Sequence, residues 1–221
     1  MNSIALNFDY YSNHRMVCKI TDDAQEVSDF FKQQELTKRI YKSHMQHHSL
    51  SYIWDDFVKN WYVFYIMRDG RDAITSLWRF YQKRNRFKGT VGEFMRSAPP
   101  AEESAYKEAI RKPKTVLQMW TYHIESWIGF PKNQVFYVHF EHLLGGFEKV
   151  IKAVGEFIDL KPYQNIQKPS RSDNVIMPGP GIAGSYKKCF TVHDESYFYD
   201  NAVYQTDMIK FFDWEALRYH A

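Results

Sequence analysis

The sequence predicts an α/β fold in which helices flank a parallel β-sheet. Short runs of continuous apolar residues alternate along the chain with longer segments of helical periodicity. Strands buried on both faces have this continuous apolar character, and their alternation with helices is typical of a parallel sheet with crossover helices. A hydrophobic content of 44% and an aromatic content of 18% exclude a disordered chain, and 221 residues suffice for one large domain with a substantial core.

Two segments have the strongest strand character. Residues 61–67 (WYVFYIM) and 134–140 (QVFYVHF) are rich in aromatic and β-branched side chains and read as continuous apolar runs. Weaker strands are predicted ahead of them, at residues 3–8, 16–20 and 39–44. In a parallel sheet, ligands bind beyond the carboxyl ends of the strands, so we expect functional residues directly after these segments.

Helices are predicted in the intervals between the strands. In residues 147–158 the apolar side chains follow the spacing i, i+3, i+4 and i+7, which places them on one stripe. The other predicted helices are residues 22–34, 53–59, 72–83, 105–111 and 115–128. Loops are predicted where Pro and Gly gather, at residues 96–103 and 178–184.

The composition argues against several classes of protein. Lys and Arg total 29 and Asp and Glu total 26, and the resulting net charge of +3 gives no argument for a nucleic-acid or membrane partner. Two cysteines cannot form a disulfide framework, which favours a reduced intracellular setting, and we expect a cytoplasmic protein. The longest apolar run is far shorter than the roughly 20 residues of a membrane helix, and the N-terminus lacks the pattern of a signal peptide.

A candidate anion site follows the first clear strand. Arg68 ends this strand, Gly70 permits a tight turn, and a helix is expected from Asp72. The N–H groups at a helix N-terminus attract phosphate, and an arginine adds a planar, permanent positive charge. Ser76 lies eight residues after Arg68, where its hydroxyl could reach the same anion. The alternative, favoured by these residues taken alone, is that Arg68 pairs with Asp69 or Asp72 at the surface.

A candidate acid–base pair lies in residues 39–46 (RIYKSHMQ). In a strand, Lys42 and His44 would share one face. A histidine can take a proton near neutral pH, and a neighbouring ammonium group can stabilise charge on a transferring group. The simpler interpretation is a solvated lysine and a histidine that packs or caps. No metal site is expected, because His44, His47 and His48 do not have the spacing of metal ligands.

A third candidate is the segment of residues 181–190 (GIAGSYKKCF). Gly181 and Gly184 would let the backbone approach a ligand closely, and Lys187 and Lys188 supply positive charge. Taken alone, this segment reads as a surface loop.

In this order and spacing, the segments resemble those of the cytosolic-type, PAPS-dependent sulfotransferases, where PAPS is 3′-phosphoadenosine 5′-phosphosulfate. Residues 39–45 (RIYKSHM) resemble the family's Lys-Thr-His segment, and residues 65–81 (YIMRDGRDAITSLWRFY) resemble its Arg-Asp-Pro-Arg-Asp segment with a serine at the same offset. Residues 135–160 resemble the strand that ends in Tyr-Glu-Asp and the helix after it. Residues 181–191 (GIAGSYKKCFT) resemble the C-terminal Arg-Lys-Gly-x-x-Gly-Asp-Trp-Lys loop. The resemblance extends from Arg39 to about Trp214.

The resemblance implies a P-loop nucleotide-hydrolase-like fold and transfer of a sulfuryl group from PAPS to a hydroxyl or amine of a small-molecule acceptor. It implies His44 as the general base and Lys42 as the group that stabilises developing charge, with no metal. The implied nucleotide-binding positions are Arg68, Ser76, Phe140, Gly181, Gly184 and Lys187. The resemblance implies neither a nucleic-acid nor a membrane partner, and it is compatible with a homodimer.

The chain departs from the family pattern where the 5′-phosphosulfate would bind. The family uses a first strand and a Pro-Lys-x-Gly-type loop there, and residues 1–38 resemble neither, so we expect both to be missing from a single domain of residues 1–221. Gly179 and Pro180 stand where the C-terminal loop of the family has Arg and Lys. Two hypotheses follow: an active sulfotransferase, or a truncated or degenerate, inactive member that at most binds a nucleotide or a partner.

Two other classes of protein are weaker alternatives. A kinase-like enzyme would have the segment G-x-x-x-x-G-K-[ST], which the sequence lacks. Nucleic-acid binding could use the basic residues 79–88 (RFYQKRNRFK), but a solvated helix end explains these residues.

Overall fold

The computed structural model describes residues 62–100, 112–128, 135–161, 165–166 and 182–203. The chain divides into two compact units, and each is considered by itself. One unit comprises Met1–Met67 and Gly129–Asn174, and the other comprises Arg68–Ile128 and Val175–Ala221. The elements predicted at residues 3–8, 16–20, 22–34, 39–44, 53–59 and 105–111 lie outside the described residues.

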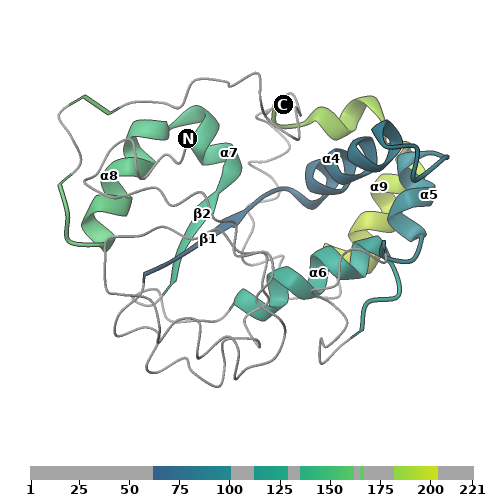
Figure 1. Cartoon of the computed structure of the whole chain (residues 1–221), viewed down its shortest axis with the longest axis horizontal. Helices are drawn as coiled ribbons and strands as arrows, with labels where there is room; N and C mark the ends of the chain where they lie inside the picture. The colour runs from purple at the N-terminus through teal and green to yellow at the C-terminus, as the bar shows by residue number, and fades with distance from the viewer. Residues whose placement is uncertain (1–61, 101–111, 129–134, 162–164, 167–181, 204–221) are drawn as a thin grey trace. The chain divides into compact units, whose positions relative to one another are not determined.

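The first unit contains a parallel pair of strands, β1 (Val63–Met67) and β2 (Val135–His139), which lie side by side in Figure 1. The register places Tyr65 opposite Tyr137. Parallel strands need a long crossover connection, and here the chain leaves the unit between them. Both strands and their parallel direction are therefore confirmed.

Two helices follow β2 in the same unit. α7 (Phe140–Gly145) begins directly after the strand, and α8 (Phe147–Phe157) comes next. α8 is the helix that the apolar stripe predicted at residues 147–158, whereas the sequence pattern did not reveal α7.

The core of this unit forms where α8 meets the strands. Ile151, Val154 and Ile158 are buried, and Phe64 of β1 and Phe136 of β2 pack against them. Burying such a side chain contributes about 1.5–3 kcal/mol relative to leaving it exposed. The predicted apolar stripe thus fixes α8 against the sheet.

The second unit is helical over its described residues. In chain order it contains α4 (Gly70–Lys83), α5 (Val91–Arg96), α6 (Val116–Trp127), the 3-10 helix η3 (Ser185–Lys188), α9 (Val192–Phe198) and the π-helical turn η4 (Tyr199–Val203). α4 and α6 confirm the helices predicted at residues 72–83 and 115–128. α5 and α9 were not foreseen, although each begins with a capping box.

α4 begins two residues earlier than predicted, because Asp69 caps it. The carboxylate of Asp69 accepts a hydrogen bond from the N–H of Arg71 at 2.9 Å. Gly70, which we assigned to a tight turn, is instead the first residue of the helix.

Both predicted loops are described in part. Arg96 is the last residue of α5, and no helix or strand is assigned to residues 97–100. Of residues 178–184, only 182–184 are described, and they lead into η3. Over the described parts of the chain, no helix is both long and apolar enough to cross a membrane.

Candidate functional site

The candidate site lies on one face of α4 in the second unit. Asp72 and Ser76 lie four residues apart on α4, so they follow one another along this face, and Arg68 stands two residues before the helix begins. Arg68 precedes the first turn, and its side chain is 22% exposed. Ser76 is half-buried in the second turn. In the chain, Asp72 therefore stands midway between the two residues that we selected for an anion, and it shares a helix face with Ser76.

Asp72 joins this face to the C-terminal loop. Its side chain is fully buried, and the carboxylate accepts three hydrogen bonds. Oδ2 accepts from the N–H of Gly184 at 2.7 Å, while Oδ1 accepts from the hydroxyl of Ser185 and the N–H of Tyr186, both at 2.9 Å. Two sequence segments that were selected separately are thus brought together by one carboxylate.

Arg68 lies between Asp72 and the same loop. Its Nη2 is 3.8 Å from Oδ2 of Asp72 and donates a hydrogen bond to the carbonyl oxygen of Ile182 at 3.4 Å. The pairing with Asp72 that we considered as an alternative is present. It does not exclude an anion site, because the two charged groups are farther apart than in a direct hydrogen bond and the arginine is partly exposed.

Asp69 and Arg71 form a second, buried pair beneath the first turn. The guanidinium Nη2 lies 2.7 Å from Oδ2 of Asp69, and Nη1 donates to the hydroxyl of Tyr199 at 3.0 Å. The guanidinium also stacks on the ring of Tyr186, 4.1 Å from its centroid. Burial opposes the charged form of Arg71, but the hydrogen bonds and charge of Asp69 outweigh it and raise the pKa of the guanidinium. Arg71 therefore links α4 to η3 and η4.

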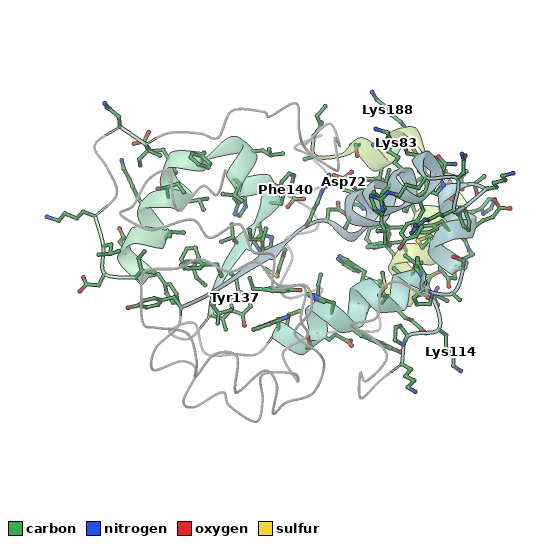
Figure 2. All side chains as sticks on the ribbon, in the orientation of Figure 1. Asp72, Lys83, Lys114, Tyr137, Phe140 and Lys188 are labelled. Atoms are coloured by element: carbon green, nitrogen blue, oxygen red, sulfur yellow. The ribbon has the colours of Figure 1, made fainter. Side chains whose placement is uncertain are left out.

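Arg79 contacts the loop further along α4. Its guanidinium donates to the Ser185 hydroxyl and carbonyl oxygen at 3.5 Å, and to Sγ of Cys189 at 3.4 Å. Figure 2 labels Asp72 and Lys83 on α4 and Lys188 on η3. Lys187 and Lys188 are both exposed. The contacts of Arg68, Asp72 and Arg79 therefore show that residues 182–189 run along α4, from just before its N-cap to its third turn.

The predicted site residues are distributed unevenly over the described structure. Arg68, Ser76, Gly184 and Lys187 lie in the second unit, and the first three are close to the Asp72 contacts or on the same helix face. Gly184 has a left-handed backbone with φ of 75°, a conformation that favours glycine, and its N–H donates to Asp72. Lys42, His44 and Gly181 lie outside the described residues.

Phe140 lies in the first unit, at the first position of α7 directly after β2, where Figure 2 labels it. Its side chain is half-buried. Beside it, burial and the nearby His142 lower the pKa of His139. Among the described residues, no group of three or more His, Cys, Asp or Glu side chains could hold a metal ion.

Sequence reasoning did not identify Asp72 as a functional residue. We considered it only as a partner that would neutralise Arg68. The available signal was its spacing, since it stands midway between Arg68 and Ser76 on a predicted helix. Its other partners are more than a hundred residues away along the chain, and no local pattern points to them.

A family model for the sulfotransferase domain matches residues 4–175 of the chain. The matched range contains β1, α4 and β2, which carry two of the resembling segments. It also includes residues 4–38, in which we recognised no family motif, and it ends before the loop that contacts Asp72.

Two solved structures have a similar fold. Mouse sulfotransferase SULT7A1, complexed with PAP, is 16% identical with a TM-score of 0.56, and the match covers 80% of this chain and 68% of that protein. The sulfotransferase from Alicyclobacillus acidocaldarius is 12% identical with a TM-score of 0.52, and the match covers 95% of this chain and 82% of that protein. These likenesses confirm the predicted fold of a parallel sheet flanked by helices. No curated protein sequence matches the chain.

Proposed function

Because the chain belongs to the sulfotransferase family, we propose that it transfers a sulfuryl group from PAPS to a hydroxyl or amine of a small-molecule acceptor. The observation that carries this proposal is that Arg68 directly follows the last residue of β1 in the chain, with Asp72 and Ser76 next on α4. In parallel α/β folds, the residues that directly follow the carboxyl ends of the strands bind the ligand.

Arg68 and Ser76 are proposed to bind the 3′-phosphate of the nucleotide. The side chain of Arg68 is partly exposed, and a guanidinium forms charge-assisted, often bidentate hydrogen bonds with phosphate. Each such bond contributes about 1.5–3 kcal/mol. By resemblance to the family, Gly181, Gly184 and Lys187 of the loop and Phe140 after β2 are proposed as further nucleotide-binding residues.

The proposed reaction conserves atoms and charge without a metal. A bond forms between the acceptor oxygen or nitrogen and the sulfur of PAPS, and the bond from sulfur to the phosphate oxygen breaks. His44 accepts the proton of the acceptor, and Lys42 stabilises the charge that develops on the transferring or departing group. The products are the sulfated acceptor and 3′-phosphoadenosine 5′-phosphate (PAP), the nucleotide named in the mouse structure. A cytoplasmic location and a homodimer are parts of the same proposal.

A titration with PAP tests the nucleotide site. We expect heat of binding with the native chain and at least about tenfold weaker binding by Arg68→Ala, because a charge-assisted contact is lost. Arg84→Ala is the matched control, since Arg84 caps the far end of α4 and contacts Phe80 instead. No binding by the native chain, or equal binding by the native chain and Arg68→Ala, would overturn the assignment of this site.

A second candidate function is nucleotide binding without transfer. Gly179 and Pro180 at the positions of two family cations, and the unrecognised phosphosulfate loop, favour it. Transfer of labelled sulfate from PAPS to a panel of phenols, steroids and amines separates the two functions. We expect transfer that His44→Ala abolishes while PAP binding is retained, whereas PAP binding with no transfer to any acceptor supports the second candidate.

A further inference from the structure

We propose that Asp72 is a positioning residue that fastens the C-terminal loop to α4 and holds Arg68 for the nucleotide. This inference deepens the proposed function and rests on it. Residues 184–186 together supply three donors to the one carboxylate, and Arg68 lies 3.8 Å from the same group. Asp72 is therefore placed to act on the site through the loop and through Arg68.

The burial of Asp72 makes the attachment strong. A fully buried carboxylate is costly unless donors replace the water that it loses, and here three donors do so at 2.7 to 2.9 Å. Hydrogen bonds to a charged acceptor are stronger than those between neutral groups. The loop cannot move away from α4 without leaving this carboxylate buried and unsatisfied, or exposing it to water.

The backbone of the loop is shaped for this contact. The left-handed conformation of Gly184 begins η3, and the N–H groups of Gly184 and Tyr186 converge on Asp72. Backbone N–H groups that converge in this way form a site for an anion. In this protein the anion is its own carboxylate, so those two donors are already occupied when a nucleotide arrives.

Arg68 is oriented by the same arrangement. Its guanidinium lies between Oδ2 of Asp72 and the carbonyl oxygen of Ile182, which belongs to the loop that Asp72 fastens. Loss of the carboxylate would therefore remove an ionic partner of Arg68 and release the loop that carries its carbonyl partner. Preorganisation of a binding group reduces the entropic cost of binding.

Asp194 offers a matched control within the same unit. Its carboxylate also accepts three hydrogen bonds, from the N–H and the hydroxyl of Thr191 and from Nη1 of Arg96. These bonds cap α9 and link it to α5, beyond the loop of residues 184–186. Asp194→Asn thus removes the same charge at a different place.

The experiment combines residue-resolved amide hydrogen exchange with PAP titration on the full chain. In Asp72→Asn an NH2 group replaces one carboxylate oxygen. Both oxygens accept hydrogen bonds from the loop, so the NH2 group must face at least one loop donor, and that hydrogen bond is lost. We expect the amides of Gly184 and Tyr186 to exchange at least about tenfold faster and PAP to bind about tenfold more weakly, as for loss of a hydrogen bond to a charged group. Ser185→Ala removes only one of the three hydrogen bonds to Asp72, together with the longer contact from Arg79 at 3.5 Å, and we expect smaller changes in the same directions.

The control variant separates positioning from general destabilisation. In Asp194→Asn we expect faster exchange at Asp194 and its neighbours, with PAP affinity and the exchange of Gly184 and Tyr186 close to native values. Unchanged exchange at these two amides in both Asp72→Asn and Ser185→Ala would overturn the attachment. Unchanged or tighter PAP binding by a folded Asp72→Asn chain, or equal weakening by Asp194→Asn, would overturn the positioning role. If the native chain does not bind PAP, that result would instead contradict the proposed function.

Discussion

The ring of Trp120 packs directly against Gly70, so that α6 contacts the first residue of α4 where that residue has no side chain. A Cβ atom at position 70 would lie 2.6 Å from Cη2 and Cζ2 of the ring, closer than non-bonded carbon atoms approach. The φ of Gly70 is not in the left-handed region, so the backbone conformation does not require glycine at this position. The requirement comes instead from the close packing of Trp120. The helix that follows Arg68 and carries Ser76 is positioned in part by this contact.

We therefore expect Gly70→Ala to destabilise the protein by about 1–3 kcal/mol, the usual cost of overpacking. The free energy of unfolding in urea measures this effect. Gly145→Ala is the control, since a Cβ there would meet no atom within 4 Å. Equal stability of the two variants would show that Trp120 can move aside without cost.

The buried pair of Asp69 and Arg71 leads to a second prediction. Arg71 is 1% exposed, and its guanidinium is bound by Asp69 and Tyr199. Removing one partner of a buried ion pair leaves the other charge without compensation and costs about 3–5 kcal/mol. We expect Arg71→Met to destabilise the chain by an amount in this range, measured by urea unfolding.

Exposed Arg86 provides the comparison for that variant. Arg86→Met removes the same charge from a site near the end of α4, and we expect a change within about 0.5 kcal/mol. If the Arg71→Met chain is as stable as the Arg86→Met chain, the buried pair makes no net contribution to the free energy of unfolding.

The sequence predicted those parts of the fold that local pattern determines. The strands at residues 61–67 and 134–140 and the helix at 147–158 follow from hydrophobic periodicity, which reports burial directly. α5 and α9 are short, with too few turns to show a period. Their capping boxes, Thr90 with Glu93 and Thr191 with Asp194, were the readable signal.

The site was predictable only in part, for a physical reason. Arg68 and Ser76 are close in the sequence, one just before the N-cap of α4 and the other in its second turn, so a local pattern could identify both. The contact of Asp72 with Gly184 spans 112 positions of the chain and depends on how the second unit packs. No periodicity encodes such a contact, so the residue that joins the two segments was not identified.

The pKa of Asp194 gives a prediction about acid stability. Burial alone would raise it, but hydrogen bonds from Arg96 and Thr191 outweigh burial and lower the pKa of this carboxyl. Because the folded pKa lies below the unfolded value, the unfolded chain binds more protons between the two. The resulting stabilisation is present above about pH 4 and is lost as the pH falls through the folded pKa.

We therefore expect native stability to fall below about pH 4 with a slope that Asp194→Asn reduces. Urea unfolding at a series of pH values measures the slope. Identical slopes for the two chains in this range would contradict the lowered pKa of Asp194.

The hydroxyl of Ser76 gives the last prediction, which concerns affinity rather than stability. Ser76 is half-buried on the α4 face that follows Arg68 and Asp72, and Ser76→Ala removes a donor to the proposed 3′-phosphate. We expect PAP to bind about tenfold more weakly, as for a lost bond to a charged acceptor, with little change in unfolding free energy. Ser126→Ala is the matched control, because its hydroxyl donates to the carbonyl of His123 within α6. Calorimetric titration at one fixed salt concentration measures both variants, and equal affinities would place the phosphate away from the second turn of α4.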